Sequence, residues 1–188
     1  SDGWTQIATT STPSYTDKNA KEGQTYYYTA RAYHGDDLST YELFPDITVL
    51  ACPEFTMTNR TNGVTIDWEK VAGAQTYRVY RRTSATGSWT QLTEVSGLSY
   101  TDQTAKSGTT YYYTVRAYAG SNSSRYISTR TTIFLENPQV ETSCVKSVVT
   151  VSWEKITGAS GYRVYRRESE SDGWTQIATT STPSYTDK

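Results

Sequence analysis

The stretch VTIDWEKVAGAQTYRVYRR, residues 64–82, decides the fold because it alternates apolar and polar side chains twice. In its first part Val64, Ile66 and Trp68 alternate with polar residues, and this period of two is typical of a β-strand with one buried face. After the turn VAGA a second alternation begins, with one face formed by Tyr77, Val79 and Arg81. The stretch therefore predicts two consecutive strands, each with one side toward a core.

The same pattern returns 85 positions later, as VTVSWEKITGASGYRVYRR at residues 149–167. GQTYYYTARAY at residues 23–33 returns at the same interval, as GTTYYYTVRAY at residues 108–118. Repetition at a fixed period indicates stacked structural modules. The interval between the copies is then the length of one module.

The two ends of the chain are identical, since SDGWTQIATTSTPSYTDK occupies both residues 1–18 and residues 171–188. Two module types, A and B, therefore alternate. Residues 51–135 form a complete module B, residues 136–188 the N-terminal part of one copy of module A, and residues 1–50 the C-terminal part of another.

Composition fits small β-rich modules outside the cell. Hydrophobic residues make up 35% of the chain, and the mean hydropathy is -0.67. A membrane-spanning helix needs an apolar run of about 20 residues. The sequence has no run that approaches this length, so we expect no membrane insertion in this segment. Turn residues recur every 8–12 positions between β-branched and aromatic stretches, which favours an all-β sandwich. No helix is predicted.

Charge differs between the two module types. Module B holds nine Lys and Arg against five Asp and Glu, a net +4, whereas residues 136–188 with 19–50 hold eight against twelve, a net -4. Opposite potentials would favour A-to-B junctions or staggered lateral association, and screening by salt would weaken them. Alternatively, the difference is unselected variation on solvated surfaces. Neither module is basic enough to indicate binding to nucleic acid.

Four motifs in fixed order give each module its family resemblance. They are a Trp in the second strand, YRVYR in the third, the segment SYTD, and the pattern G-x-T-Y-x-Y in the sixth. On these motifs the whole chain resembles tandem bacterial fibronectin type III domains, which implies immunoglobulin-like β-sandwiches, one complete and two partial. The resemblance also implies that Tyr111 and Tyr26 are tyrosine-corner residues whose hydroxyls cap a backbone carbonyl.

The strand order of that family makes the two partial modules incomplete. The part of module A at the N-terminus would begin after the first three strands, and the part at the C-terminus would stop after the fifth. Neither part closes a sandwich, so each exposes a hydrophobic sheet face and unpaired edges. One hypothesis is head-to-tail complementation between copies, which does not close and so builds a filament. The alternative is that both ends are cuts through a continuous array.

Alternation in the sixth strand places Tyr112, Thr114, Arg116 and Tyr118 on the outer face of module B, opposite the core. The third strand adds Arg78, Tyr80 and Arg82 to that face. One interpretation is cross-strand pairing that stiffens the sheet; the other is a surface for a glycan, a protein ligand or a neighbouring fibre. The candidate interaction face across both modules comprises Tyr80, Tyr112, Arg116, Tyr118, Tyr27, Arg31, Tyr33 and Tyr165.

The two cysteines fall at different places in the repeat. Cys52 lies in the linker from module A to module B, and Cys144 lies near the end of the first strand of A. By the topology of the resembled family, a complete module A brings these positions together. The resulting disulfide would join two molecules of this chain, and it would persist in an extracellular setting. Two free thiols are the alternative.

Catalysis finds no support in the sequence. No nucleophile elbow, zinc-protease motif, phosphate loop or CxxC pair occurs. His34 stands beside Asp36 and Asp37, but this spacing is poor for metal ligands. We expect no enzyme, no catalytic residue, no cofactor and no metal.

Two function classes remain open. The first is a non-enzymatic structural module of an extracellular or cell-surface bacterial stalk or filament, whose partners are other copies of the chain. The second is an adhesion or glycan-binding accessory module that uses the Tyr and Arg face. Near-identical repeats favour the first.

Overall fold

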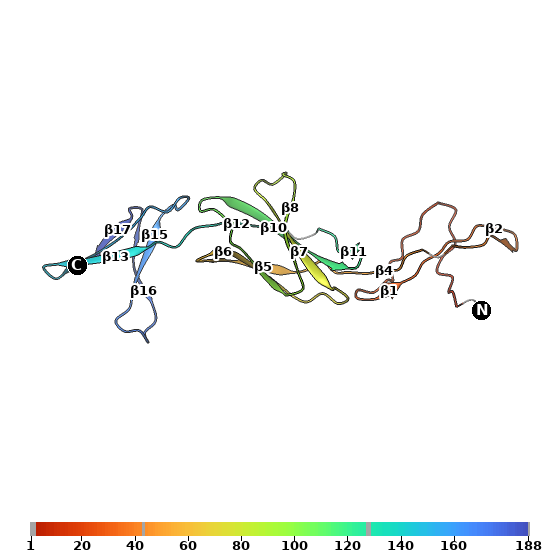
Figure 1. The fold of residues 1–188 in the computed structure, drawn as a ribbon, viewed down its shortest axis with the longest axis horizontal. Helices are drawn as coiled ribbons and strands as arrows, with labels where there is room; N and C mark the ends of the chain where they lie inside the picture. The colour runs from red at the N-terminus through yellow and green to blue at the C-terminus, as the bar shows by residue number, and fades with distance from the viewer. Residues whose placement is uncertain (1–2, 43, 127–128, 188) are drawn as a thin grey trace.

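The computed structural model describes residues 3–42, 44–126 and 129–187, and within these ranges its regular elements are all β-strands. Figure 1 shows an extended arrangement, with a complete sandwich in the middle. Strands β1 to β4 lie at one end of it and strands β13 to β17 at the other. The two partial modules therefore lie on opposite sides of the complete one.

The complete sandwich pairs a three-stranded sheet with a larger one. The first sheet has the order β5-β6-β9, with bounds Phe55–Arg60, Gly63–Trp68 and Ser99–Asp102. The second has the order β8-β7-β10-β11, with β12 also paired to β10. Its bounds are Thr90–Val95 for β8, Thr76–Arg82 for β7, Thr110–Ala119 for β10, Asn122–Ser123 for β11 and Arg130–Ile133 for β12. All these pairings are antiparallel.

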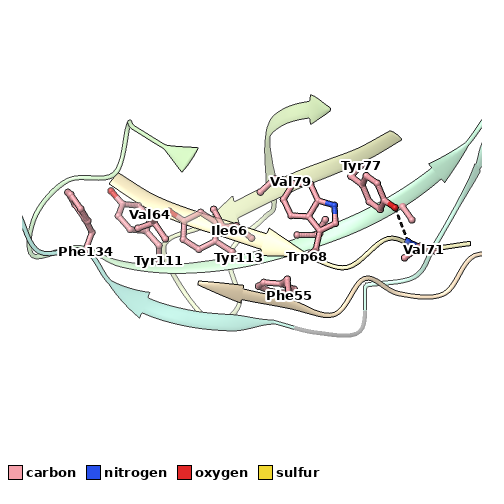
Figure 2. Close-up of a cluster of buried hydrophobic side chains, with 12 residues drawn as sticks. Phe55, Val64, Ile66, Trp68, Val71, Tyr77, Val79, Tyr111, Tyr113 and Phe134 are labelled. Carbon is pink, nitrogen blue, oxygen red and sulfur yellow. Dashed lines mark hydrogen bonds between the residues drawn. The ribbon is translucent and has the colours of Figure 1, made fainter. Parts of the chain in front are cut away.

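The core lies between these sheets, as Figure 2 shows. Strand β6 contributes alternate residues, because successive side chains of a strand point to opposite faces. Strands β7 and β10 do the same from the other sheet. The buried cluster comprises Phe55, Val64, Ile66, Trp68, Val71, Tyr77, Val79, Tyr111, Tyr113, Val115, Ala117 and Phe134. Each large apolar side chain buried here stabilises the module by about 1.5–3 kcal/mol.

Tyrosine hydroxyls satisfy backbone donors at the turns before the sixth strand. The Tyr111 hydroxyl accepts the N–H of Lys106 at 3.0 Å, and Tyr26 accepts the N–H of Lys21 at 2.9 Å. The residues expected at the tyrosine corner therefore bond backbone, but they cap an N–H where a carbonyl was expected. The reason is local, since the Lys106 carbonyl already accepts the N–H of Thr109 at 3.2 Å.

A buried carboxylate joins the two sheets. Asp102 is fully buried, and its Oδ2 accepts both the Arg81 Nη1 at 2.6 Å and the Tyr113 hydroxyl at 2.7 Å. Thr104 donates to the other carboxylate oxygen from its hydroxyl and its N–H. Burial by itself raises the pKa of Asp102, but these hydrogen bonds outweigh it and hold the pKa below its ordinary value. Burial and the nearby Asp102 raise the pKa of Tyr113.

The C-terminal partial module repeats the first five strands of the complete one at an offset of 85. Its sheets are β13-β14-β17 and β15-β16, with bounds Val140–Val145, Val148–Trp153, Ser184–Asp187, Tyr162–Arg166 and Thr175–Thr180. The register is the same, since Val140 pairs with Trp153 as Phe55 pairs with Trp68. However, Val140 is 58% exposed and Phe55 only 2%.

The N-terminal partial module carries the strands that the C-terminal one lacks. Its pairs are β1 (Thr25–Tyr26) with β4 (Ile47–Thr48) and β2 (Tyr33–His34) with β3 (Asp37–Leu38). Thr25 pairs with Thr48 as Thr110 pairs with Ile133, so this register also repeats module B. No strand occurs in residues 3–24.

We predict that Asp102→Ala destabilises the complete module by about 3 kcal/mol, because it leaves the Arg81 guanidinium without its buried partner. Urea unfolding followed by tryptophan fluorescence measures this. The pKa of Asp102 is lower in the folded module than in the unfolded chain, where it is about 3.9. The stabilisation by Asp102 is therefore fully present above about pH 3.9, and it is lost as the pH falls through the pKa of the folded state. Asp67→Ala, at a half-buried position, is the control. A loss no larger than in the control contradicts the role of Asp102.

Candidate interaction surfaces

The outer face of the larger sheet carries a continuous ladder of aromatic rings and guanidinium groups in contact. Arg82 lies over Trp89, 4.3 Å from the ring centroid, and Trp89 stacks on Tyr126 with centroids 6.2 Å apart. Arg116 lies over Tyr126 at 4.4 Å. Further contacts extend the ladder to Tyr112 at one end and to Tyr118 and Arg78 at the other. Contacts of this kind contribute about 0.5–1 kcal/mol each.

The ladder leaves two of the predicted face residues largely covered. Tyr80 and Tyr118 are each 8% exposed, and their hydroxyls share a hydrogen bond of 2.8 Å. Thr114 is also buried. The expectation that these three side chains face solvent is wrong, because the long side chains of the same face fold over them. Burial and the hydroxyl pairing raise the pKa of Tyr80 to about 12. Tyr112 and Arg116 are half-buried.

Sequence reasoning missed Trp89 and Tyr126, which form the centre of the ladder. The repeat carried a signal for both, because Trp174 and Tyr41 stand 85 positions from them. In module A, the contact that matches Arg82 on Trp89 lies in the C-terminal partial module, and the contact that matches Arg116 on Tyr126 lies in the N-terminal one. Arg167 lies over Trp174 at 4.5 Å, and Arg31 lies over Tyr41 at 5.7 Å.

The remaining predicted face residues are exposed. Tyr27, Tyr33 and Tyr165 are 64%, 61% and 45% exposed, and Arg31 is exposed as well. They belong to different ends of the chain, so the structure does not bring Tyr165 together with the other three. In a complete module their counterparts are Tyr112, Tyr118, Tyr80 and Arg116. There Tyr118 contacts both Tyr80 and Arg116, whereas Tyr112 contacts Arg82. These side chains of module A are exposed because its third and sixth strands lie at opposite ends of the chain.

Cys52 and Cys144 are both unpaired within the chain. Cys52 is half-buried, and its thiol donates to the Arg125 carbonyl at 3.1 Å, whereas Cys144 is exposed on β13. The predicted disulfide therefore remains a proposal. The repeat informs it, because the positions one module period away are Asn137 and Asn59.

These two asparagines lie at the end of module B where the chain continues into the next module. Asn59 Nδ2 donates to the Ile133 carbonyl at 2.8 Å, and Asn137 Nδ2 donates to Thr61 Oγ1 at 3.1 Å. Asn59 thus bonds the segment that leads into Asn137, and Asn137 bonds the turn that follows Asn59. A complete module A would place Cys144 and the following Cys52 in the same relation, and a disulfide between them needs their Cα atoms within about 7 Å.

A pair of glycine turns forms each joint between neighbouring modules. A Cβ on Gly158 would clash with the Cα of Gly108, and a Cβ on Gly73 would lie 3.2 Å from the Cα of Gly23. A side chain at Gly158 would therefore clash at the joint after module B, and one at Gly73 would fit tightly at the joint before it, so both joints bring two backbones close together. Gly23 and Gly108 are 85 positions apart, and so are Gly73 and Gly158. The same joint recurs on both sides of the complete module.

The C-terminal partial module has an apolar groove. Its lining includes Val140, Val151, Trp153, Tyr162 and Val164. The counterparts of these residues in module B are the core residues Phe55, Ile66, Trp68, Tyr77 and Val79. There the space is filled by β10 and by Phe134. The matching sequence of module A lies in residues 23–50.

His34, Asp36 and Asp37 fall in or beside the exposed β2–β3 hairpin. Among the residues that the structure describes, no three His, Cys, Asp or Glu side chains gather as ligands for a metal ion. The same residues include no helix with the length and apolarity to cross a membrane.

No family model matches the chain. Among curated proteins it is similar to exoglucanase B of Cellulomonas fimi, with 27% identity over 220 residues. The similarity covers 98% of this chain, which spans 19% of the length of the exoglucanase.

Three solved structures of β-domains are also similar. The Fn3-like protein from Clostridium thermocellum has 26% identity and a TM-score of 0.41, over 44% of this chain and 90% of that one. The chicken interferon gamma receptor alpha chain has 14% identity and a TM-score of 0.42, over 55% and 56%. The chicken CNTN1 FN1-FN3 domains have 16% identity and a TM-score of 0.40, over 80% and 60%.

Strand order defines the class of protein. A three-stranded sheet β5-β6-β9 faces a sheet in which β7 pairs with β8 and β10, and the tyrosine-corner residues lie where the family places them. The predicted fold class is therefore confirmed. The chain is all-β and consists of fibronectin type III-like modules, one complete and two partial.

We predict that Tyr80→Ser destabilises the complete module by about 3 kcal/mol, because it removes a buried ring and leaves the Tyr118 hydroxyl without its partner. Tyr112→Ser is the matched control at a half-buried position, and we expect it to cost less than about 1 kcal/mol. Thermal unfolding of both variants measures the difference. Equal losses would mean that Tyr80 does not support the fold.

We predict that Asn59→Cys with Asn137→Cys, in a background of Cys52→Ser and Cys144→Ser, forms a disulfide within one chain. Glutathione disulfide supplies the oxidising equivalents and is reduced to two glutathione thiols as the two cysteine thiols join. The natural pair instead gives covalent oligomers on a non-reducing gel. Single-cysteine variants are the control. If the engineered pair stays reduced, the joint does not hold these positions within bonding distance, and the proposed pairing fails.

Proposed function

We propose that the chain is a non-enzymatic structural unit of an extracellular or cell-surface bacterial stalk that grows as a linear array. The observation that carries this proposal is the recurrence of the glycine joint on both sides of the complete module. A contact that repeats with the sequence period sets the same relation between every pair of neighbours. Modules that contact only their neighbours in this way build length, as in other repeat proteins.

Hydrogen bonds support a fixed joint. At the junction after module B, the Ser107 hydroxyl donates to the Thr157 carbonyl at 3.0 Å and accepts the N–H of Glu136 at 3.2 Å. Asn137 adds its bond to Thr61. The junction thus joins side chains of module B, Ser107 and Thr61, to backbone and side-chain groups of the next module, which restricts the hinge between them.

Other copies of the chain are the proposed partners. The groove of the C-terminal partial module matches the space that β10 fills in module B, and residues 23–50 of a second copy carry the sequence of that strand. Val140 and Trp174, 58% and 62% exposed, would be covered by such docking. The contact is heterologous, so it extends in one direction without closing. The opposite net charges of modules A and B add an attraction that salt weakens.

The second candidate function is an adhesion or glycan-binding accessory module, and the similarity to part of an exoglucanase supports it. The exposed rings of Tyr27, Tyr33 and Tyr165 would offer the stacking surface. However, the counterparts of Tyr33 and Tyr165 in the complete module are buried in the ladder. Completion of module A would cover them in the same way, so the structural function is the better supported one.

We predict that the wild-type chain forms straight filaments one module wide at high concentration, as imaged by negative-stain electron microscopy. Gly158→Ala would give bent or shorter filaments, because the new Cβ clashes with Gly108 and opens the joint. Light scattering across a concentration series measures the mass in parallel.

Gly120→Ala is the matched control for this variant. Gly120 has a positive φ of 55°, like Gly158 with 84°, but a Cβ there would meet nothing within 4 Å. The control carries the backbone strain of the substitution without the clash at the joint. A wild-type chain that remains a monomer at every concentration contradicts the proposed assembly. Equal straightness of the Gly158 variant and wild type contradicts the role of the joint.

A further inference from the structure

One arginine of the aromatic ladder in module B already binds a carboxylate. Arg78 lies over the Tyr118 ring, 4.0 Å from its centroid, and its Nε donates to Glu94 Oε2 at 2.8 Å. A planar guanidinium makes both contacts because its N–H groups point outward in its own plane, away from the face that stacks on the ring. An arginine of this ladder can therefore stack on an aromatic ring and bind an anion at the same time.

Arg82 and Arg116 stack on rings in the same way but lack a carboxylate. Arg82 donates to the Gly87 carbonyl at 3.3 Å. Arg116 donates to the Ser124 carbonyl at 2.8 Å and to the Ser123 hydroxyl. Within the part of the chain that the structure describes, neither guanidinium forms an ion pair. Since each guanidinium has five N–H donors, both keep donors for an anion.

The two hairpins that follow the ladder strands differ in charge between the module types. In module A the β15–β16 and β2–β3 hairpins carry five acidic residues, Glu168, Glu170, Asp172, Asp36 and Asp37. In module B the same five positions, in the β7–β8 and β10–β11 hairpins, hold the uncharged residues Thr83, Ala85, Gly87, Ser121 and Asn122. Acidic side chains beside the face lower its potential and repel anions. The face of module B therefore keeps the positive potential of its arginines and favours an anionic partner.

The two arginines without a carboxylate stand well apart on the face. Arg116 pairs with Arg78, which lies four positions from Arg82 along β7, and this corresponds to about 13 Å of strand. The Trp89 and Tyr126 rings stack on each other and link the two guanidinium groups. One small anion does not span this interval. A polymer with a negative charge on successive units does, and its second contact is strengthened because the first already holds the chain in place.

The ladder also distinguishes between kinds of polymer. The bases of a nucleic acid bind by stacking on open ring faces. Here Trp89 and Tyr126 are each already in contact with an arginine and with the other ring. An acidic peptide pairs its backbone at the edge of a sheet, whereas the ladder covers the face of β7 and β10, which are paired on both sides. A sugar chain carries hydroxyls and carboxylates, which suit arginine and serine side chains on an open face.

We propose that the ladder of module B binds an acidic polysaccharide, a sugar chain with carboxylates on successive units. Arg82 and Arg116 each donate to one carboxylate of the chain, as Arg78 donates to Glu94 within the module. The inference goes beyond the proposed stalk, because it gives module B a ligand and depends on no contact between copies. It also differs from the second candidate function, which uses the exposed rings of module A.

Biolayer interferometry with immobilised polygalacturonate and dilute chain tests the proposal. We expect the wild-type chain to bind at low salt, to bind more weakly as sodium chloride is added, and not to bind neutral galactan. Arg116→Gln should weaken binding about tenfold, because it removes a charge-assisted hydrogen bond. Arg60→Gln is the matched control, since it removes the same charge from an exposed position on β5 in the other sheet. We expect it to leave binding nearly unchanged.

A second variant leaves every ladder residue in place. Ser121→Asp with Asn122→Asp gives module B the two aspartates that module A carries in its matching hairpin. We expect it to weaken binding about threefold or more at low salt, because the added charges repel the carboxylates. Circular dichroism verifies that each variant keeps its β-structure.

Three outcomes overturn the proposal. The first is no binding of polygalacturonate by the wild-type chain. The second is equal loss in Arg116→Gln and Arg60→Gln, which would mean that net charge alone decides. The third is binding of polyglutamate or single-stranded DNA at least as tight as that of polygalacturonate, which would assign the face to a peptide or a nucleic acid. The proposed stalk stands or falls separately, on the imaging of filaments.

Discussion

Pairing of the third strand with the sixth is the constraint on which each sandwich depends. In module B, β7 and β10 pair over seven consecutive positions, from Thr76 with Tyr118 to Arg82 with Tyr112. This pairing closes the core on one side and the aromatic ladder on the other. In module A the same two strands lie at opposite ends of the chain. The exposed valines and rings of the partial modules follow from that separation, since their sequence matches buried positions of module B.

Buried polar groups make the pairing specific. Asp102 is costly to bury unless its partners from both sheets are present, so it favours a sandwich in which β7, β9 and β10 meet in one register. Each partial module holds one of these partners, Arg166 at one end and Tyr28 at the other. An apolar surface alone would accept many occupants. A carboxylate that lacks one of its two donors favours an occupant that supplies it.

The glycine joints apply a similar restriction between modules. Gly108 and Gly158 approach so closely that a side chain on either would clash with the other turn. Close backbone contact leaves little freedom for the hinge, and Ser107 and Asn137 add hydrogen bonds across it. An array in which every joint holds this glycine contact gains length and direction together. This is why we favour a stalk over a surface that binds ligands.

The sequence by itself determined the strands, their inward faces and the module period. Alternation at Val64, Ile66 and Trp68 and the repeat at an interval of 85 predicted these correctly, because period-two burial is a local property of the chain. Only the tertiary structure decided which outer-face residues are covered. Tyr126 packs against Tyr80 and Arg78 packs against Tyr118, at separations of 46 and 40 positions in the sequence, and alternation carries no information about such contacts. The direction of the Tyr111 hydrogen bond was likewise set by which backbone group the turn left unpaired.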